Sequence, residues 1–226
     1  MSGVAVLIPW RGGCEHRARA LAWVVARHAE NPWPVVIGRH DHGEWCKARA
    51  TAEALAQTDA AVLVLVDADV WTDGLALAVS KVAEGAAWAI PHRGVFRLAE
   101  DATTRLLDGD KPDVARLAER AYLGTEAGGI VVMRRDVYEA CPLDARFVGW
   151  GSEDEAHGMA LRTLYGPPWR GKASLTHLWH QPQDRATRSF GSESGRDLRK
   201  RYARCQGNPD AMRALLREAP CLLPTC

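Results

Sequence analysis

Short apolar segments alternate with helical segments over the first 91 residues, and this alternation constrains the fold more than any other feature. The expected strands are residues 4–10, 35–38, 60–66 and 86–91. The expected helices are residues 14–30, 44–57 and 73–85. Continuous apolar strands separated by amphipathic helices predict an α/β fold with a mostly parallel central sheet that is covered on both faces. Ligands of such sheets bind beyond the carboxyl ends of the strands.

The third apolar segment, AAVLVLV, ends in two carboxylates, Asp67 and Asp69. On an extended chain, side chains two residues apart point the same way, so these two can share one hard cation or divide between a cation and a sugar hydroxyl. Oxygen ligands favour Mg²⁺ or Mn²⁺, which usually keep positions open for substrate phosphates. The alternative is a pair of solvated loop carboxylates, because a bare Asp-x-Asp is common by chance. The position directly after an apolar strand favours the functional interpretation.

A second candidate segment is RFVGWGSEDEAHGMAL, residues 146–161. Two glycines flank Trp150, so the backbone can turn tightly around one large aromatic side chain. Glu153 and Asp154 then open an expected helix, where acidic residues suit the positive end of the helix dipole. Ordinary helix capping by Ser152 explains the acids, but it does not explain the Gly-Trp-Gly sequence before them.

The segment SLTHLWHQP, residues 174–182, carries His177 and His180 around a tryptophan at the end of a short expected strand. A lone histidine is more often structural than a metal ligand. Two histidines this close, in a chain that also has an aspartate pair, leave a metal-binding role and a structural role equally open. Imidazole is a commoner ligand of Mn²⁺ than of Mg²⁺, which favours Mn²⁺.

The bulk composition excludes several classes of protein. The 29 Lys and Arg residues nearly balance the 28 Asp and Glu residues, so a net charge of +1 gives no general attraction to nucleic acid or membranes. No apolar run approaches the roughly 20 residues of a membrane span, and the N-terminus does not resemble a signal peptide. The six scattered cysteines are expected to be reduced thiols, as in a cytosolic protein.

Together these segments resemble the nucleotide-sugar glycosyltransferases of the GT-A fold, whose central sheet is Rossmann-like. VLVLVDADV is similar to the DxD strand of that family. The sequence from Gly128 to Leu161 resembles the galactosyltransferase C-terminal region, with the G-W-G-x-E-D signature shared by β-1,4-galactosyltransferases and polypeptide N-acetylgalactosaminyltransferases. LTHLWHQP resembles the late metal-binding histidine, and VLIPWRGG resembles the opening strand. The four motifs follow the family's order and span most of residues 4–182.

The resemblance implies a role for each matched residue on the donor side. Asp69 would bind the metal directly, and Asp67 would hold the ribose or sugar, or contact the metal through water. His180 or His177 would be the third protein ligand of a Mn²⁺ or Mg²⁺ ion. The remaining donor-side positions are Pro9, Trp10 and Arg11 of the nucleotide pocket, Gly128 and Gly129 beside the donor sugar, and Lys47 and Arg49, which with Arg11 are candidates to add positive charge near the diphosphate.

On the acceptor side, the resemblance implies that Trp150 stacks on a sugar ring and that Glu153 and Asp154 face the acceptor hydroxyl. Breaking a sugar–diphosphate bond builds negative charge on the departing phosphate, which a divalent cation neutralises. The attacking hydroxyl also needs a carboxylate that removes its proton. Asp154 is the expected base, so we expect an inverting hexosyltransferase that uses a UDP-sugar. The related N-acetylgalactosaminyltransferases retain configuration without a base, so this stereochemistry depends on Asp154 alone.

The expected organisation is a GT-A domain over residues 1–182, followed by a basic, mainly helical appendage over residues 183–226. No stem or membrane anchor is evident, so we expect a cytoplasmic enzyme of bacterial or phage origin. The acceptor, whether a glycan, a protein or modified DNA, stays open. The basic excess of the appendage fits an anionic acceptor, although a solvated helix face is the simpler explanation.

Two other classes of protein stay open. A sugar nucleotidyltransferase has a similar sheet but needs a Gly-rich, Arg- or Lys-bearing phosphate loop after the first strand, and PWRGGCEHR matches such a loop only weakly. A non-catalytic carbohydrate- or nucleotide-binding module is the other alternative.

Overall fold

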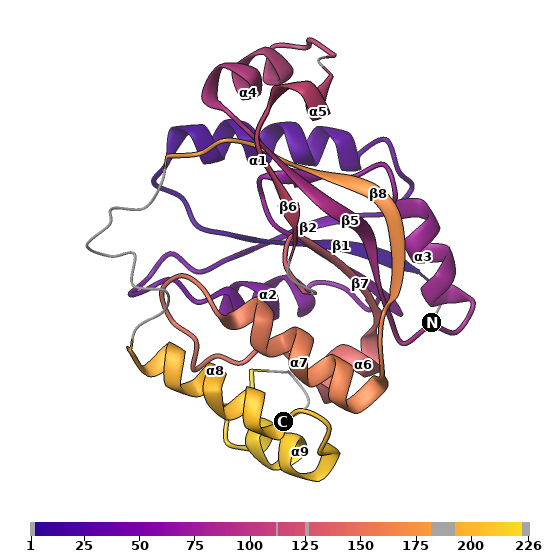
Figure 1. Ribbon diagram of the computed structural model, residues 1–226, viewed down its shortest axis with the longest axis vertical. Helices are drawn as coiled ribbons and strands as arrows, with labels where there is room; N and C mark the ends of the chain where they lie inside the picture. Colours follow the sequence, from indigo (N-terminus) through magenta and orange to yellow (C-terminus); the bar gives the residue numbers. More distant parts are fainter. Residues whose placement is uncertain (1–2, 112, 125–126, 182–192, 223–226) are drawn as a thin grey trace.

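The computed structural model describes residues 3–111, 113–124, 127–181 and 193–222, which form a central sheet flanked by helices (Figure 1). The strands are β1 (Val4–Trp10), β2 (Val35–Arg39), β3 (Val62–Val66), β4 (Val70–Trp71), β5 (Trp88–Leu98), β6 (Ala118–Leu123), β7 (Ile130–Arg134) and β8 (Trp169–His177). The helices are α1 (Glu15–His28), α2 (Lys47–Leu55), α3 (Leu75–Ala83), α4 (Glu100–Leu107), α5 (Val114–Leu117), α6 (Arg135–Ala140), α7 (Glu153–Tyr165), α8 (Glu193–Cys205) and α9 (Pro209–Arg217). None of the helices in these ranges is long and apolar enough to cross a membrane.

The sheet has the strand order β2-β1-β3-β7-β5-β8-β4, and β6 pairs with β5 outside this path. Parallel ladders join β1 to β2 and β3, and β5 to β8. Antiparallel ladders join β7 to β3 and β5, β4 to β8, and β6 to β5. Five of the strands therefore point the same way, and β4, β6 and β7 oppose them. The expected α/β fold is confirmed, with β7 inserted antiparallel in the middle of the sheet.

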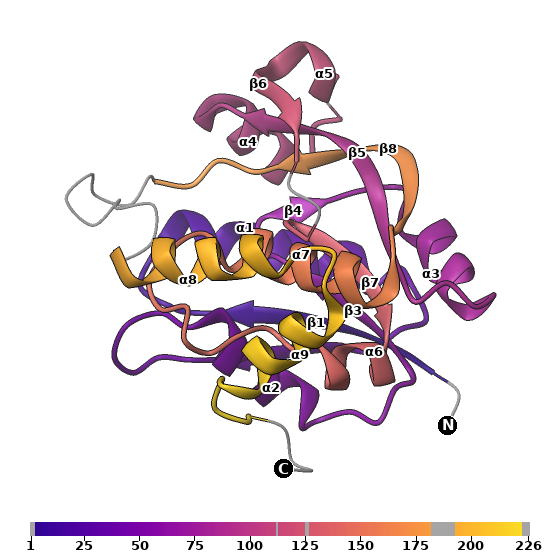
Figure 2. The ribbon, with the colours of Figure 1, turned by 60° about the horizontal axis from the view of Figure 1, so that its bottom comes forward.

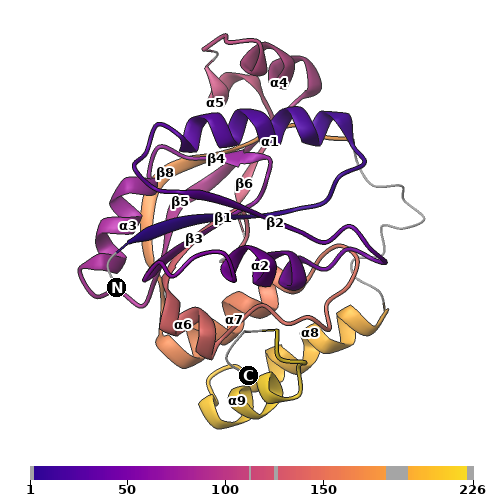
Figure 3. The same cartoon turned by 180° about the vertical axis from the view of Figure 1, so that it is seen from behind.

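Alternate residues of the central strands face two separate hydrophobic clusters, as the period of two in a strand requires. In β3, Leu63 and Leu65 pack with α2, α6 and α7, whereas Val62, Val64 and Val66 pack with α1, α3 and α4. Helix α1 lies on one side of the sheet and α2 on the other (Figure 3). We call these sides the α1 face and the α2/α7 face.

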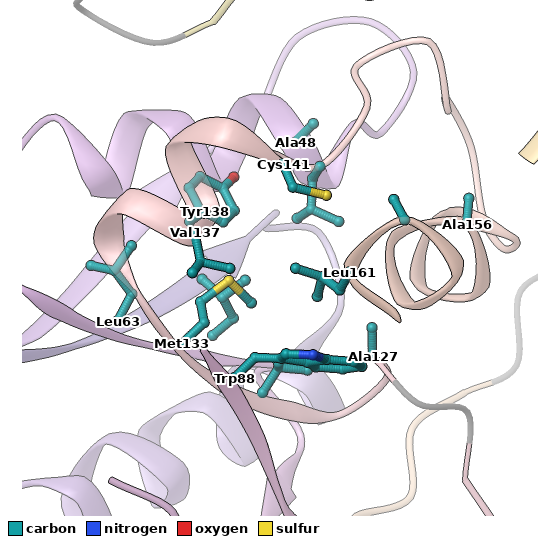
Figure 4. Close-up of a cluster of buried hydrophobic side chains, with 14 of the residues drawn as sticks. Ala48, Leu63, Trp88, Ala127, Met133, Val137, Tyr138, Cys141, Ala156 and Leu161 are labelled. Carbon is teal, nitrogen blue, oxygen red and sulfur yellow. The ribbon is translucent and has the colours of Figure 1, made fainter. Parts of the chain in front are cut away.

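The core of the α2/α7 face fixes helix α7 over the sheet. Trp88, Met133 and Leu161 are fully buried there and point toward one another (Figure 4). The indole Nε1 of Trp88 also donates a hydrogen bond to the Gly166 carbonyl at 3.0 Å, directly after α7 ends. This packing holds the acidic first turn of α7 in place at the opposite end of the helix.

The strand expected over residues 86–91 is longer than the sequence pattern indicates. Strand β5 continues to Leu98 because its second half pairs in parallel with β8, and Val95 and Leu98 are buried. Residues 92–127, where the alternation of strands and helices becomes irregular in the sequence, therefore contain the second part of β5 as well as α4, α5 and β6. The extension places Arg97 opposite His177 in the register of the two strands.

The C-terminal helices share the hydrophobic core of the α2/α7 face. Leu198 and Tyr202 of α8 and Met212 and Leu215 of α9 are buried in the same cluster as the residues beneath α7. The hydroxyl of Tyr202 donates to the carboxylate of Asp144 at 2.8 Å. Figure 2 shows α8 and α9 along the side of the molecule that carries α7. A mainly helical stretch was expected here, but its burial was not.

The cysteines differ from the expectation at one position. Cys14, Cys46, Cys141 and Cys205 are free thiols, as expected. Cys221 is disulfide-bonded, so the expectation of a fully reduced chain is wrong at that residue.

Candidate active site

The Asp-Ala-Asp sequence at the end of β3 forms a turn. The N–H of Val70 donates to the carbonyl of Asp67 at 3.4 Å, and residues 68 and 69 lie in the turn. The expectation that the two aspartates point the same way along an extended chain is therefore wrong. Asp67 instead contacts residues of α2 and the segment before β7, whereas Asp69 contacts α1 and the segment after β8.

Asp67 is held by Gly129, one of the two glycines expected beside the donor sugar. The N–H of Asp67 donates to the Gly129 carbonyl at 2.9 Å, and the N–H of Gly129 donates to Asp67 Oδ2 at 3.2 Å. Gly129 has a φ of 79°, and a Cβ at this position would lie 2.6 Å from Leu175 Cδ2. Glycine is therefore required for this backbone to approach the aspartate. Gly128 precedes it and is half-buried.

Lys47 joins Asp67 to Asp154, the expected base. Its Nζ lies 2.7 Å from Asp67 Oδ1 and 2.8 Å from Asp154 Oδ1, and its side chain is only 12% exposed. Lys47 begins α2 and Asp154 is the second residue of α7, so two helices of the same face supply this bridge. Lys47 was expected near a diphosphate, but its charge is directed at the two carboxylates instead.

Burial sets the protonation of this cluster. Burial, followed by the charges of Glu153 and Asp67, raises the pKa of Asp154 to about 7, against the opposing effect of Lys47. Burial also raises the pKa of Glu153. Burial alone would lower the pKa of Lys47, but the charges of Asp154 and Asp67 outweigh it and raise that pKa well above its usual value. Asp154 is therefore tuned to exchange a proton near neutral pH.

The Gly-Trp-Gly loop before α7 has an unusual backbone. Gly149, Gly151 and Ser152 all have positive φ angles, of 81°, 102° and 73°. The alternative of ordinary capping by Ser152 does not hold, because its side chain makes no cap hydrogen bond and its backbone is left-handed. Such a conformation costs a non-glycine residue about 1–3 kcal/mol and is typical of functional sites. Trp150 is 44% exposed in this loop, as a sugar-stacking residue would be.

Asp69 forms a second cluster with the two late histidines. Asp69, His177 and His180 each offer a ligand atom within 4.8 Å of the others, and Asp67 is not a member of this group as the described residues define it. Asp69 is 5% exposed. The pKa of its carboxyl is lowered despite burial, because His177, His180 and Arg17 favour the charged form.

Hydrogen bonds to backbone carbonyls fix the tautomers of both histidines. Nδ1 of His180 donates to the Gln181 carbonyl at 3.0 Å, so in the neutral ring the unprotonated Nε2 faces Asp69 Oδ2 at 3.5 Å. Burial lowers the pKa of His180, so the ring stays neutral at neutral pH. Two acceptors that face each other with no proton between them suit a cation, as does a histidine oriented by a carbonyl.

Both ring nitrogens of His177 already have hydrogen-bond partners. Its Nδ1 donates to the Leu178 carbonyl at 2.9 Å, and its Nε2 accepts a hydrogen bond from Arg97 Nη2 at 2.9 Å. The sequence left the choice between the two histidines open. The hydrogen bonds favour His180 as the direct ligand, and His177 can join it only if Arg97 moves away.

No family model matches the sequence, and no curated protein matches it. Solved structures do share its fold. Mannosyl-3-phosphoglycerate synthase from Rubrobacter xylanophilus has a TM-score of 0.51 and 15% identity over 90% of this chain and 74% of its own. Glucosyl-3-phosphoglycerate synthase from Mycobacterium tuberculosis has a TM-score of 0.50 and 12% identity over 84% and 76%. GalNAc-T7 has a TM-score of 0.50 and 13% identity over 80% of this chain but only 44% of its own. The chain has the GT-A fold.

The GT-A sheet places the other expected donor-side residues near the ends of β1 and β2. Pro9 and Trp10 are buried at the end of β1, and Arg11 is half-buried directly after it. Arg49 is exposed on α2. Burial and the charges of Arg49 and Arg11 lower the pKa of His40, which follows β2. Both arginines therefore act electrostatically on His40.

Two arginines of the GT-A site were not anticipated. Arg17 lies 4.0 Å from Asp69, and Arg97 donates to His177. The helical pattern of residues 14–30 gives no sign that Arg17 faces a site. Arg97 lies beyond residue 91, where its strand was expected to end. Only the paired register of β5 and β8 brings Arg97 to the histidine.

Proposed function

We propose that the protein is a metal-dependent glycosyltransferase that moves a hexose from a UDP-sugar to an acceptor hydroxyl with inversion. The cluster of Asp69, His177 and His180 at the carboxyl edge of the GT-A sheet carries this proposal. Its fold neighbours support it, because the structures of glucosyl-3-phosphoglycerate synthase and GalNAc-T7 hold Mn²⁺ and UDP. Asp154 lies on the other side of the same Asp-Ala-Asp turn, linked to it through Lys47.

The donor set of the cluster fits a divalent ion. Asp69 would supply a carboxylate oxygen and His180 an imidazole nitrogen, with His177 as a further ligand. An ion bound there would neutralise the charge that develops on the departing diphosphate. Imidazole ligands favour Mn²⁺ over Mg²⁺. Asp67, which is held by Lys47 and Gly129, is then left to bind the ribose or sugar of the donor.

Asp154 would take the proton of the acceptor. The hydroxyl oxygen forms a bond to the anomeric carbon, and the bond from that carbon to the β-phosphate oxygen breaks, so that UDP leaves with the electron pair. The hydroxyl proton passes to Asp154 as the new bond forms. Lys47 contacts Oδ1 of Asp154, and Oδ2 accepts no hydrogen bond from the described residues, which leaves it for the hydroxyl. Direct displacement by one nucleophile inverts the anomeric centre.

Thermal stabilisation by a panel of nucleotide sugars, with and without Mn²⁺, tests this function. We expect a UDP-sugar to raise the melting temperature, and we expect EDTA and the Asp69→Ala variant to abolish the rise. Stabilisation by a nucleoside triphosphate plus a sugar phosphate, but by no nucleotide sugar, would indicate a sugar nucleotidyltransferase. Binding without any turnover, unchanged in Asp154→Asn, would indicate a non-catalytic module.

A further inference from the structure

We propose that Arg17 binds the diphosphate of the donor, and that it serves as the counter-ion of Asp69 while donor and metal are absent. This assignment rests on the proposed function, because the phosphates that Arg17 of α1 would bind are those of a nucleotide sugar. Arg17 is therefore a donor-positioning residue that the sequence motifs do not include.

The contacts of Arg17 leave its guanidinium free to bind an anion. Its Nε lies 4.0 Å from Asp69 Oδ2, which is too far for a hydrogen bond. That Nε is buried, and it has no hydrogen-bond partner among the described residues. A buried donor without an acceptor is unfavourable, so an oxygen supplied by a ligand would relieve it. The side chain is still 32% exposed, so a ligand can reach it from solvent.

Aromatic contacts hold the start of α1 against the metal cluster. The ring of His16 packs edge-on against Trp179, with 4.7 Å between the ring centroids. The guanidinium carbon of Arg17 lies 5.9 Å from the centroid of the Trp10 ring, within the range of a cation–π contact. Trp179 lies between the two late histidines, and Trp10 ends β1. Arg17 therefore lies against Trp10, in a first helical turn that His16 holds against Trp179.

The other two cations beside the Asp67 and Asp69 clusters already have hydrogen-bond or ion-pair partners. Lys47 contacts Asp67 and Asp154, and Arg97 donates to His177. Among these three cations, Arg17 alone donates no hydrogen bond to the part of the chain that the structure describes. A guanidinium matches the geometry of phosphate oxygens and can bind two of them at once. Its place beside Asp69 would bring it to phosphates that a metal on Asp69 also contacts.

The test compares Arg17→Ala with Arg19→Ala, a matched variant in the same helix whose arginine pairs with Asp108 on the surface. Calorimetry would measure the affinities for UDP and UMP at saturating Mn²⁺. Electron paramagnetic resonance would measure Mn²⁺ binding without nucleotide. We expect Arg17→Ala to weaken UDP binding about tenfold, with UMP binding little changed and Mn²⁺ binding equal or tighter. Arg19→Ala should behave as the wild type.

Unchanged UDP affinity in Arg17→Ala would overturn the assignment. Equal losses for UDP and UMP, or weaker Mn²⁺ binding, would show a structural role and would also overturn it. Arg17→Lys keeps the positive charge but lacks the planar set of N–H donors of a guanidinium. A UDP affinity between those of Arg17→Ala and the wild type would therefore support phosphate binding. If the wild type binds Mn²⁺ but not UDP, the proposed function fails, and this assignment fails with it.

Discussion

At the scale of single residues, the contact between Asp69 and His180 favours a metal site over a structural pair. A structural histidine beside a carboxylate would direct an N–H toward it. Here the N–H of His180 is given to the Gln181 carbonyl, and the bare nitrogen faces the carboxylate at 3.5 Å. His177, in contrast, already accepts a hydrogen bond from Arg97.

This difference predicts an order of effects on metal affinity. His180→Ala should weaken Mn²⁺ binding by at least about tenfold, because it removes a coordinating nitrogen rather than a residue that only orients a ligand. His177→Ala should have the smaller effect, because Arg97 competes for its nitrogen. Titration of Mn²⁺ by electron paramagnetic resonance measures both. The reverse order, or equal effects, would contradict the assignment of His180.

Asp154 is expected to act in the chemical step and not in donor binding. Asp154→Asn keeps an acceptor oxygen for Lys47 but cannot take a proton. Turnover should fall about 10²–10⁴-fold, while UDP-sugar affinity stays within about threefold. Release of UDP from a UDP-sugar, with water as the acceptor, gives a measurement that needs no knowledge of the natural acceptor. Full activity in this variant would exclude Asp154 as the base.

The raised pKa of Asp154 also sets a pH dependence. Burial raises this pKa to about 7, and a base works only when it is deprotonated. UDP release should therefore rise with pH below about 7 and level off above it. The residual activity of Asp154→Asn should lack this rise. A rate that is flat between pH 5 and 8 in the wild type would contradict this role.

At the scale of the elements, Gly129 decides how closely β7 approaches the Asp-Ala-Asp turn. Gly129→Ala should destabilise the protein by about 2–3 kcal/mol, because it adds a clash with Leu175 to a strained backbone. Gly149→Ala is the matched control, since Gly149 has a similar φ of 81° but no atom within 4 Å of a Cβ. It should cost only about 1–2 kcal/mol. Denaturant unfolding measures both, and equal costs would exclude the clash.

The elements that the sequence predicts well are those with a clear local period. The strand over residues 4–10 matches β1, and the helix after Ser152 matches α7. Strand β5 runs past its expected end because pairing with β8 is a long-range contact with no local pattern. The turn after β3 was missed for a similar reason, since its partners Lys47 and Gly129 are distant in sequence.

The sequence predicts which residues belong to the candidate site better than it predicts how they are arranged. The motifs include Asp69, His180 and Asp154, which the structure places in two clusters joined by one turn. Arg17 could not be found, because a helical arginine in a polar pattern normally faces solvent. The hydrogen bond from Arg97 to His177 depends on the register of β5 and β8, which the sequence does not reveal.

At the scale of the whole molecule, the C-terminal helices belong to the core that positions α7. Met212 is fully buried in the same cluster as Leu161. Met212→Ala should destabilise the whole protein by about 2–5 kcal/mol in one unfolding transition. Arg204→Ala, on the exposed surface of α8, should change stability by less than about 0.5 kcal/mol. A separate early transition in Met212→Ala would show instead that residues 183–226 form an independent appendage.

The two faces of the sheet supply different parts of the proposed reaction. Arg17 lies on the α1 face beside the Asp69 cluster, and Lys47 and Asp154 lie on the α2/α7 face. The turn at residues 67–70 joins them, so a donor bound over this edge would contact both. We propose that a divalent ion at Asp69 and His180 contacts the diphosphate of that donor.

Pulsed electron paramagnetic resonance of Mn²⁺ bound to the protein with UDP would detect both the imidazole and the phosphate next to the ion. We predict a ¹⁴N coupling from a coordinated imidazole, which His180→Ala removes, together with a ³¹P coupling from the nucleotide. A Mn²⁺ spectrum with neither coupling, unchanged from the ion in water, would contradict the account.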